Sequence, residues 1–313
     1  MLRFTARRIA LSVPVMAVVA TLTFFLVELV PGDPAAFLLG TGATAQQISQ
    51  LHHQLGLDRP VLAQYGSWFG DALQLDLGTS LISNQSVVAT LGQALPVTLS
   101  VAILATLFTL VVGVLLGVLA AVRGGVLDRI VQSAGSLAMA IPSFWLAAVL
   151  VLGLAIKLPL LPATGYISLS ASPSQWVSHL VLPMIAVGLS GVGPVAFQTR
   201  AAVADQLSRE YVRTQIAAGL PTRRILFKHV LRNASGPVVT VVSLGFVFAL
   251  GGVVIIESIF NLPGMGTLML KSVRSHDLPL VQGAVLFFSL LVVAVNLLAD
   301  LAVAGLNPKV RLG

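Results

Sequence analysis

The chain carries very little charge. Only 9% of its 313 residues are Asp, Glu, Lys or Arg, whereas 57% are hydrophobic. Soluble globular domains have roughly a quarter of their residues charged. The sequence is therefore typical of a polytopic membrane protein. Cysteine is absent altogether, which excludes a disulfide framework and a thiolate metal site.

Further absences limit the chemistry. No Gly-Lys pair occurs, so the phosphate-binding loop G-x-x-x-x-G-K-[ST] is missing, and energy must come from another chain or from an ion gradient. No histidine lies deep in an apolar run, so Ser190 in the stretch "GLSG" has no neighbouring base for nucleophilic catalysis. The adjacent His52 and His53 make a poor metal pair. We therefore expect no catalytic residue, cofactor or metal on this chain.

Six apolar segments are long enough to cross a membrane as helices. The first is longer than the apolar core of a signal peptide, so we expect it to be retained. The fourth contains two prolines and three glycines, which neighbouring helices can accommodate, so we expect it inside the bundle. Gly113 and Gly117 form a GxxxG pattern in the second segment and predict close helix packing. The segments are Ile9–Leu29, Val97–Val122, Ile130–Ile156, Trp176–Phe197, Val238–Ile256 and Val281–Leu306.

The distribution of Lys and Arg predicts that both termini are cytoplasmic. With six spans, fourteen of the eighteen basic residues fall on the inner side, as the positive-inside rule requires. The net charge of +7 is thereby explained without nucleic acid as a partner. We expect the chain to divide into four parts. They are an N-terminal segment with the first helix (1–29), an extracytoplasmic segment (30–96), a core of five helices (97–306) and a cytoplasmic tail (307–313).

The extracytoplasmic segment is predicted to hold short amphipathic helices. Their breaks are expected at Gly56, Pro60 and Gly78.

The inner loop 199–237 contains a concentrated polar stretch, "EYVRTQIAAGLPTRRILFKHVLRN", from Glu210 to Asn233. It predicts one helix that ends at Gly219, a tight turn, and a second helix with Pro221 in its first turn. The preference for positive charge on the cytoplasmic side would by itself explain the arginines, but it would not explain a structured hairpin. We therefore favour a docking element for a cytoplasmic partner.

The second helix of this hairpin is predicted to have one apolar and one basic face. Leu226 pairs with Val230, and Phe227 with Leu231, at i,i+4 spacing. The basic residues Arg223, Arg224 and Lys228 then face elsewhere.

The stretch "EYVRTQIAAGLPTRRILFKHVLRNASGPVV" is similar to the cytoplasmic loop of binding-protein-dependent ABC permeases, in the version of the dipeptide/oligopeptide/nickel importer family. Ala218 stands where that family usually has Lys, and Gln215 where it often has Ala. The resemblance extends over the whole chain. Its other motifs are "LVPGDPA", "GLDRPVLAQYGSWF", "LDLGTS", "ESIFNLPGMG", "NLLADL" and "LNPKVR", the last with Asn307 in place of the usual Asp.

This resemblance implies an all-α, type I ABC importer permease fold in the bacterial inner membrane. It implies a non-catalytic subunit that forms half of a path for di- or oligopeptides, with nickel, glutathione or another small solute as alternative cargo. The implied partners are a second homologous permease, two ATPases that bind ATP and Mg²⁺, and an external substrate-binding protein. The implied ATPase-coupling residues are Glu210, Tyr211, Arg213, Thr214, Ala217, Gly219, Leu220, Arg223, Arg224, His229 and Arg232.

Glu257 and Asp300 are the acidic residues nearest the membrane interior. We favour structural roles for both, in helix-end anchoring or bundle contacts, and expect water close to Glu257. A stand-alone carrier coupled to protons or sodium would need such a carboxylate and is the alternative. No inverted repeat is evident, and only the importer hypothesis explains the hairpin.

Overall fold

The protein is helical throughout the part that can be described. The computed structural model describes residues 2–29, 31–40 and 42–306, so the predicted tail 307–313 lies outside the described residues. Within them, the one pair of bridged extended residues is Thr79 and Ser86. Five helices are long and apolar enough to cross a membrane, and a bent helix pair brings the number to six if it counts as one span.

The chain divides into two compact units. Unit 1 is built on Val97–Leu262, and unit 2 on Ala6–Pro96 together with Pro263–Val293. The long helices α5 (Val87–Arg123) and α13 (Leu278–Leu306) each contribute to both units. Residues 263–293, which the sequence groups with the five-helix core, pack instead with unit 2. The reason is a shared buried cluster that contains Val87, Leu91, Ala94, Met265, Leu280 and Ala284.

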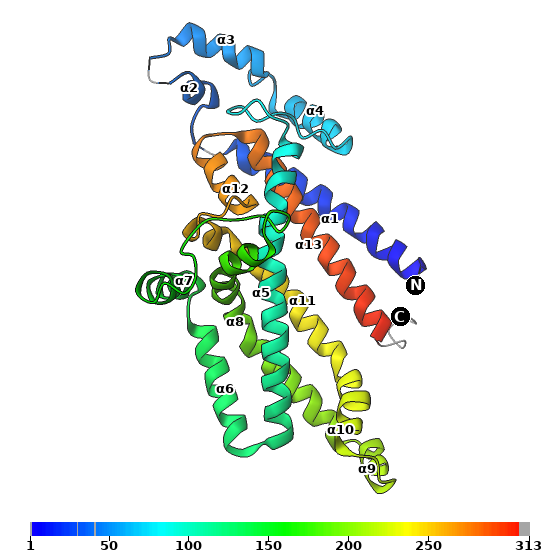
Figure 1. Cartoon of the computed structure of the whole chain (residues 1–313). Helices are drawn as coiled ribbons and strands as arrows, with labels where there is room; N and C mark the ends of the chain where they lie inside the picture. The colour runs from blue at the N-terminus through cyan, green and yellow to red at the C-terminus, as the bar shows by residue number, and fades with distance from the viewer. Residues whose placement is uncertain (1, 30, 41, 307–313) are drawn as a thin grey trace. The chain divides into compact units, whose positions relative to one another are not determined.

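Helix α8 (Pro173–Ser208) is the central helix of unit 1 (Figure 1). It packs against α6 (Gly125–Ala140), α7 (Ser143–Leu150) and α11 (Leu231–Ile259). More than half of its apolar core is buried, the largest share among the candidate spans. The expectation that the proline- and glycine-rich span lies inside a bundle is confirmed for this unit.

Small residues let α5 and α8 approach closely. A Cβ atom on Gly113 would lie 2.7 Å from Cβ of Val195, and one on Gly117 would lie 2.5 Å from the carbonyl oxygen of Ala196. On the opposite side of the contact, a Cβ on Gly188 would lie 2.7 Å from the carbonyl oxygen of Ala105. The two backbones are therefore close enough that a methyl group would not fit at any of these three positions.

The third predicted span, Ile130–Ile156, is not one straight helix. α6 ends at Ala140, and the axis turns by 95° before α7 and the π-helical segment η1 (Val151–Lys157). Pro142 explains the break, because the residue before a proline is disfavoured in the helical region. Ile141 accordingly has φ −79° and ψ 119°.

Unit 2 contains α1 (Leu2–Glu28, from Ala6 onward) and the short helices of residues 31–96. These are α2 (Pro34–Leu39), α3 (Ala45–Leu55) and α4 (Val61–Leu73). α3 ends at Gly56 in the left-handed conformation, and α4 begins after Pro60. Neither α3 nor α4 contains a buried residue. Isolated helices of 11 and 13 residues are marginally stable in water, and α4 gains support from the contacts of Tyr65 and Trp68 with Phe24 of α1.

The motif "LVPGDPA" forms the start of α2. Asp33 accepts hydrogen bonds from the backbone amides of Ala35 and Ala36, and Pro34 occupies the first helical turn. His52 on α3 contacts the same carboxylate through Nε2 at 2.7 Å. The hydrogen bond from His52, with the two amide contacts, holds the pKa of Asp33 below its usual value. The cap therefore stays ionised well into the acidic range.

The turn between α12 (Met265–Arg274) and α13 holds the loop 78–86 against the start of α13. Asp277 is buried, with 3% exposure. Its carboxylate accepts a hydrogen bond from Ser80 Oγ at 2.5 Å and one from the amide of Leu81 at 3.1 Å. Its carbonyl oxygen accepts the amide of Val281 in the first turn of α13. One residue thus fixes a loop 196 positions away to this helix end.

Replacing Gly117 by Ala is expected to destabilise unit 1 by about 1–3 kcal/mol, because the added methyl group would overlap the α8 backbone. The measurement is the melting temperature of the purified protein in detergent. Gly251→Ala on α11 is the matched control, since a Cβ there meets nothing within 4 Å. Equal melting temperatures for the two variants would contradict the close α5–α8 contact.

Replacing Asp277 by Asn is expected to weaken the attachment of residues 78–86 by about 1.5–3 kcal/mol, because two hydrogen bonds to a charged acceptor are lost. Limited proteolysis within residues 78–86 should become faster. Asp71→Asn removes a carboxylate that is exposed and makes no hydrogen bond among the described residues, so it should leave the cleavage rate unchanged.

Candidate coupling hairpin and translocation cavity

A hairpin of short helices joins α8 to α11 at the tip of unit 1 (Figure 1). α9 (Glu210–Ala217) ends in a turn in which Gly219 has φ +79°. The amide of Gly219 donates to the carbonyl of Ile216, and the amide of Leu220 to that of Gln215. This is the Schellman arrangement, in which a glycine takes the left-handed conformation directly after the helix.

The second arm begins one residue later than the sequence predicts. Pro221 is the N-cap of α10 (Thr222–Arg224) and has an extended ψ of 137°, so it lies before the first helical turn. α10 continues through the π-helical segment η2 (Ile225–Val230) into α11. The residues from Thr222 to Ile259 therefore form one continuous helix of 38 residues.

A buried cluster attaches the hairpin to its supporting helices. Val203 of α8, Val212 of α9, Ile225 and Val230 of η2 and Ala234 of α11 pack together. The predicted stripe of Leu226 with Val230 and Phe227 with Leu231 is wrong in part, because Phe227 is 68% exposed. The reason is the π-helical turn, whose hydrogen bonds span five residues. It brings Ile225 and Val230, five positions apart, to the buried face.

The predicted coupling residues fall into two groups. Tyr211, Leu220 and His229 are half-buried. The Tyr211 hydroxyl donates to Gln206 Oε1 at 3.0 Å and accepts from Asn233 Nδ2 at 3.4 Å, which links the end of α8 to the start of α11. The exposed group is Glu210, Arg213, Thr214, Ala217, Gly219, Arg223, Arg224 and Arg232.

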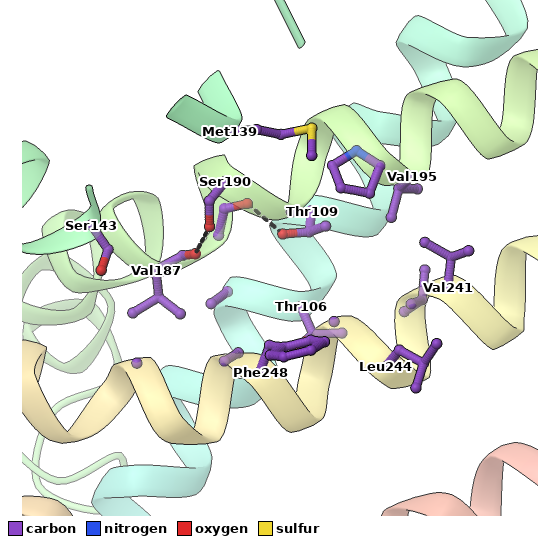
Figure 2. A pocket seen from close by; sticks show the side chains of 18 residues that line it. Thr106, Thr109, Met139, Ser143, Val187, Ser190, Val195, Val241, Leu244 and Phe248 are labelled. Atoms are coloured by element: carbon purple, nitrogen blue, oxygen red, sulfur yellow. Dashed lines mark hydrogen bonds between the residues drawn. The ribbon is translucent and has the colours of Figure 1, made fainter. Parts of the chain in front are cut away.

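A cavity of about 650 Å³ lies within unit 1, lined by residues of α5, α6, α7, α8 and α11. Figure 2 shows Thr106 and Thr109 of α5, Ser190 of α8 and Phe248 of α11 around it. This volume is in the range of roughly 300–1,000 Å³ that is usual for small-molecule sites. The sequence does not indicate which residues line this cavity. They come together only through the packing of α5, the α6–α7 pair, α8 and α11.

Three of the four side-chain hydroxyl groups in the cavity wall are bonded to nearby backbone. Thr109 Oγ1 donates to the carbonyl of Gly188 at 2.6 Å, and Ser190 Oγ donates to the carbonyl of Val187 at 3.2 Å (Figure 2). Thr106 Oγ1 donates to the carbonyl of Ala102 at 2.8 Å. These three hydroxyl protons are already used, whereas the hydroxyl of Ser143 has no hydrogen bond among the described residues and can donate to a solute.

An ion pair between α6 and α8 was not predicted from the sequence. Arg200 Nε lies 2.8 Å from Asp128 Oδ1, and Arg200 Nη2 lies 2.5 Å from Asp128 Oδ2. This two-point geometry is the strong form of the Arg–carboxylate contact. The two residues are 72 positions apart, and nothing in the sequence indicates that they meet.

The acidic residues near the apolar spans differ from each other. Glu257 is fully buried, with 0% exposure, and accepts a hydrogen bond from Thr98 Oγ1 at 2.5 Å. The expectation of water beside Glu257 is therefore wrong, because α5 covers this end of α11. Asp300 on α13 is half-buried. Among the described residues, no group of three His, Asp or Glu side chains could hold a metal ion.

Comparison with known proteins agrees with this architecture. Residues 113–312 match the family described as binding-protein-dependent transport system inner membrane component, and residues 1–102 match the N-terminal region of such membrane components. The solved MetNI methionine ABC transporter, in inward-facing conformations, shares the fold with a TM-score of 0.54 and 16% sequence identity. That comparison covers 70% of this chain and 97% of the other.

Curated relatives match over almost their full length. A Brucella abortus protein named as a peptide transport system permease is 38% identical, over 97% of this chain and 98% of its own. A Sinorhizobium fredii peptide ABC transporter permease protein is 35% identical, over 98% and 99%. The glutathione transport system permease protein of Escherichia coli is also 35% identical, over 99% of both chains. The chain belongs to the family of binding-protein-dependent transport system inner membrane components, and it is a permease subunit rather than an enzyme.

Proposed function

We propose that this permease forms half of the path through which an ATP-driven importer takes up small peptides. The cavity of unit 1 supports this proposal, because its size and its hydroxyl-bearing, mainly apolar wall fit a short peptide backbone with varied side chains. The relatives support the same class of solute, since two are named for peptides and one for glutathione, which is itself a tripeptide.

The proposed orientation has both termini in the cytoplasm and six crossings, with the bent α6–α7 pair counted as one. It follows from the excess of Lys and Arg on the side of the hairpin. In this orientation the hairpin faces the cytoplasm, and α2, α3 and α4 face the external binding protein.

The hairpin is proposed to be the contact with an ATPase, and the structure offers a direct route from it to the cavity. Both helices that hold the hairpin also line the cavity, α8 through Val187–Val195 and α11 through Val241–Gly252. From Val203 to Val195 the α8 route is about 12 Å, and from Ile225 to Val241 the α11 route is about 24 Å, at 1.5 Å per residue. A displacement of the hairpin would therefore move two cavity walls as rigid bodies.

The proposed assembly contains a second permease, two ATPases and an external binding protein. ATP and Mg²⁺ would bind to the ATPases. The exposed basic residues Arg223 and Arg224 on the hairpin would meet carboxylates of an ATPase, and the half-buried Tyr211 and His229 would keep the hairpin in shape.

The charge reversal Arg223→Glu with Arg224→Glu tests this function in proteoliposomes that contain the full importer. We expect ATP-driven uptake of a radiolabelled dipeptide to fall about tenfold or more, because attraction to the ATPase becomes repulsion. Arg274→Glu, an exposed arginine outside the hairpin, is the matched control and should transport normally. Normal uptake by the double variant would contradict the docking role. Uptake by this chain alone, driven by a proton gradient, would favour the secondary carrier.

Replacing Gly219 by Ile should also impair coupling, because a β-branched residue at φ +79° costs about 1–3 kcal/mol in backbone strain. The turn would then open and misdirect α10. The measurement is stimulation of ATP hydrolysis by the loaded binding protein, which should fall while the amount of assembled complex is unchanged. Gly219→Asn is the control, since asparagine tolerates the left-handed conformation. Equal stimulation in both variants would show that the turn geometry is unimportant.

A further inference from the structure

A second cavity, of about 270 Å³, lies within unit 2 between α1, α4, the loop after α4 and the start of α13. Three carboxylates line it, from Glu28, Asp71 and Asp76, and one cation, from Arg59. None of the four forms an ion pair among the described residues. The cavity therefore has a net negative charge that no neighbouring side chain neutralises directly.

The positions of two of these acids are unfavourable for the helices that carry them. Glu28 is the last residue of α1, and Asp71 lies in the last turn of α4. The C-terminal end of a helix carries partial negative charge, so a carboxylate there is repelled and a cation is attracted. Neither helix has a basic residue in its last turn. The local structure is thus arranged to accept a positive charge from outside the chain.

A buried polar side chain gives independent evidence for a ligand. Gln282 of α13 lines the cavity, is only 7% exposed, and has no hydrogen-bond partner for its amide among the described residues. The amide atoms keep some exposure, so the missing hydrogen bond leaves them available to a ligand in the cavity. Its oxygen can accept a hydrogen bond from an N–H group that enters the cavity.

An aromatic wall completes the cavity. Trp68 lines it, and the indole ring packs on the buried Phe24 with ring centroids 5.4 Å apart. Gln64 Nε2 donates to the carbonyl oxygens of Leu57 and Arg59, which fixes the adjoining loop against α4. An indole face attracts an organic cation within about 6 Å of its centre. The wall is therefore both apolar and suited to positive charge.

We propose that this cavity binds a single alkylammonium or guanidinium group, with Glu28, Asp71 and Asp76 as counter-charges, Gln282 as hydrogen-bond acceptor and Trp68 as the aromatic wall. A metal ion fits less well, because no three His, Asp or Glu side chains in the described segments are close enough to bind it together. The three carboxylates surround the cavity as separate charges, which suits an organic cation. The volume is below the roughly 300 Å³ at which sites for larger ligands begin. It therefore suits one cationic side chain or small amine rather than a whole peptide.

The test uses the full chain in nanodiscs of zwitterionic phosphatidylcholine. Trp145→Phe with Trp176→Phe leaves Trp68 as the only tryptophan, because the chain has three. Titration with n-butylammonium chloride at low ionic strength should change the fluorescence of Trp68 with saturation, and high salt should weaken the effect. Its neutral analogue n-butanol should produce no saturable change.

Glu28→Gln with Asp71→Asn in this background should weaken n-butylammonium binding about five- to tenfold, as expected for two exposed counter-charges. Asp58→Asn is the control, because Asp58 belongs to the same segment but does not line the cavity. Melting temperatures establish that each variant is folded. The proposal is overturned if binding is not saturable, if the double variant binds as well as the control, or if Ca²⁺ displaces the amine stoichiometrically.

A second experiment identifies the source of the cation, which is either a free amine or a lysine side chain of the external binding protein. Association of that protein with the chain is measured before and after acetylation of its lysines, with and without saturating n-butylammonium. Weakening by both treatments assigns the site to a lysine side chain, whereas no effect of either assigns it to a free solute. Because no transport is measured, failure here leaves the proposed import function untouched.

Discussion

Two helices in a membrane gain no hydrophobic free energy by burying apolar side chains against each other, because lipid tails are equally apolar. α5 and α8 associate instead by close van der Waals contact of their backbones, which the missing side chains of Gly113, Gly117 and Gly188 permit. This contact fixes α8 in the middle of unit 1, and α8 in turn positions α6, α7 and α11 around it. The cavity wall and the support of the hairpin both depend on this arrangement.

The same packing explains how a distant motion could reach the solute. The hairpin has its own buried cluster, formed by Val203, Val212, Ile225, Val230 and Ala234. A Schellman turn at Gly219 closes its tip. Beyond the cluster, α8 and α11 continue without a break to the cavity. Packed helices transmit displacement because their interiors are dense and have few voids.

Two buried carboxylates hold distant segments of the chain together. Glu257 and Asp277 are buried, and each accepts a strong hydrogen bond from a hydroxyl group. Each therefore ties two segments that are far apart in the sequence. Gln282 is buried beside a cavity and has no such partner among the described residues. Gln282 differs from these two carboxylates because it lines a cavity, where a ligand can supply the missing hydrogen bond.

Local sequence patterns were enough to predict the helical membrane class, the break at Gly56, the glycine turn at Gly219 and the burial of α8. These features follow from local composition and backbone preference, which act over a few residues. The bend at Pro142 could also have been predicted from the sequence, because the residue before a proline avoids the helical conformation. The prediction of Ile130–Ile156 as a single span did not take this proline into account.

The remaining features come from the packing of distant segments in the folded protein. This packing paired Arg200 with Asp128, covered Glu257 with Thr98, and placed residues 263–293 with the N-terminal segments. In the folded protein, the π-helical segment η2 buries Ile225 and Val230 and exposes Phe227. The physical reason is that these outcomes depend on contacts between segments tens to hundreds of residues apart. Periodicity and composition describe one segment at a time and carry no information on which distant segment it will meet.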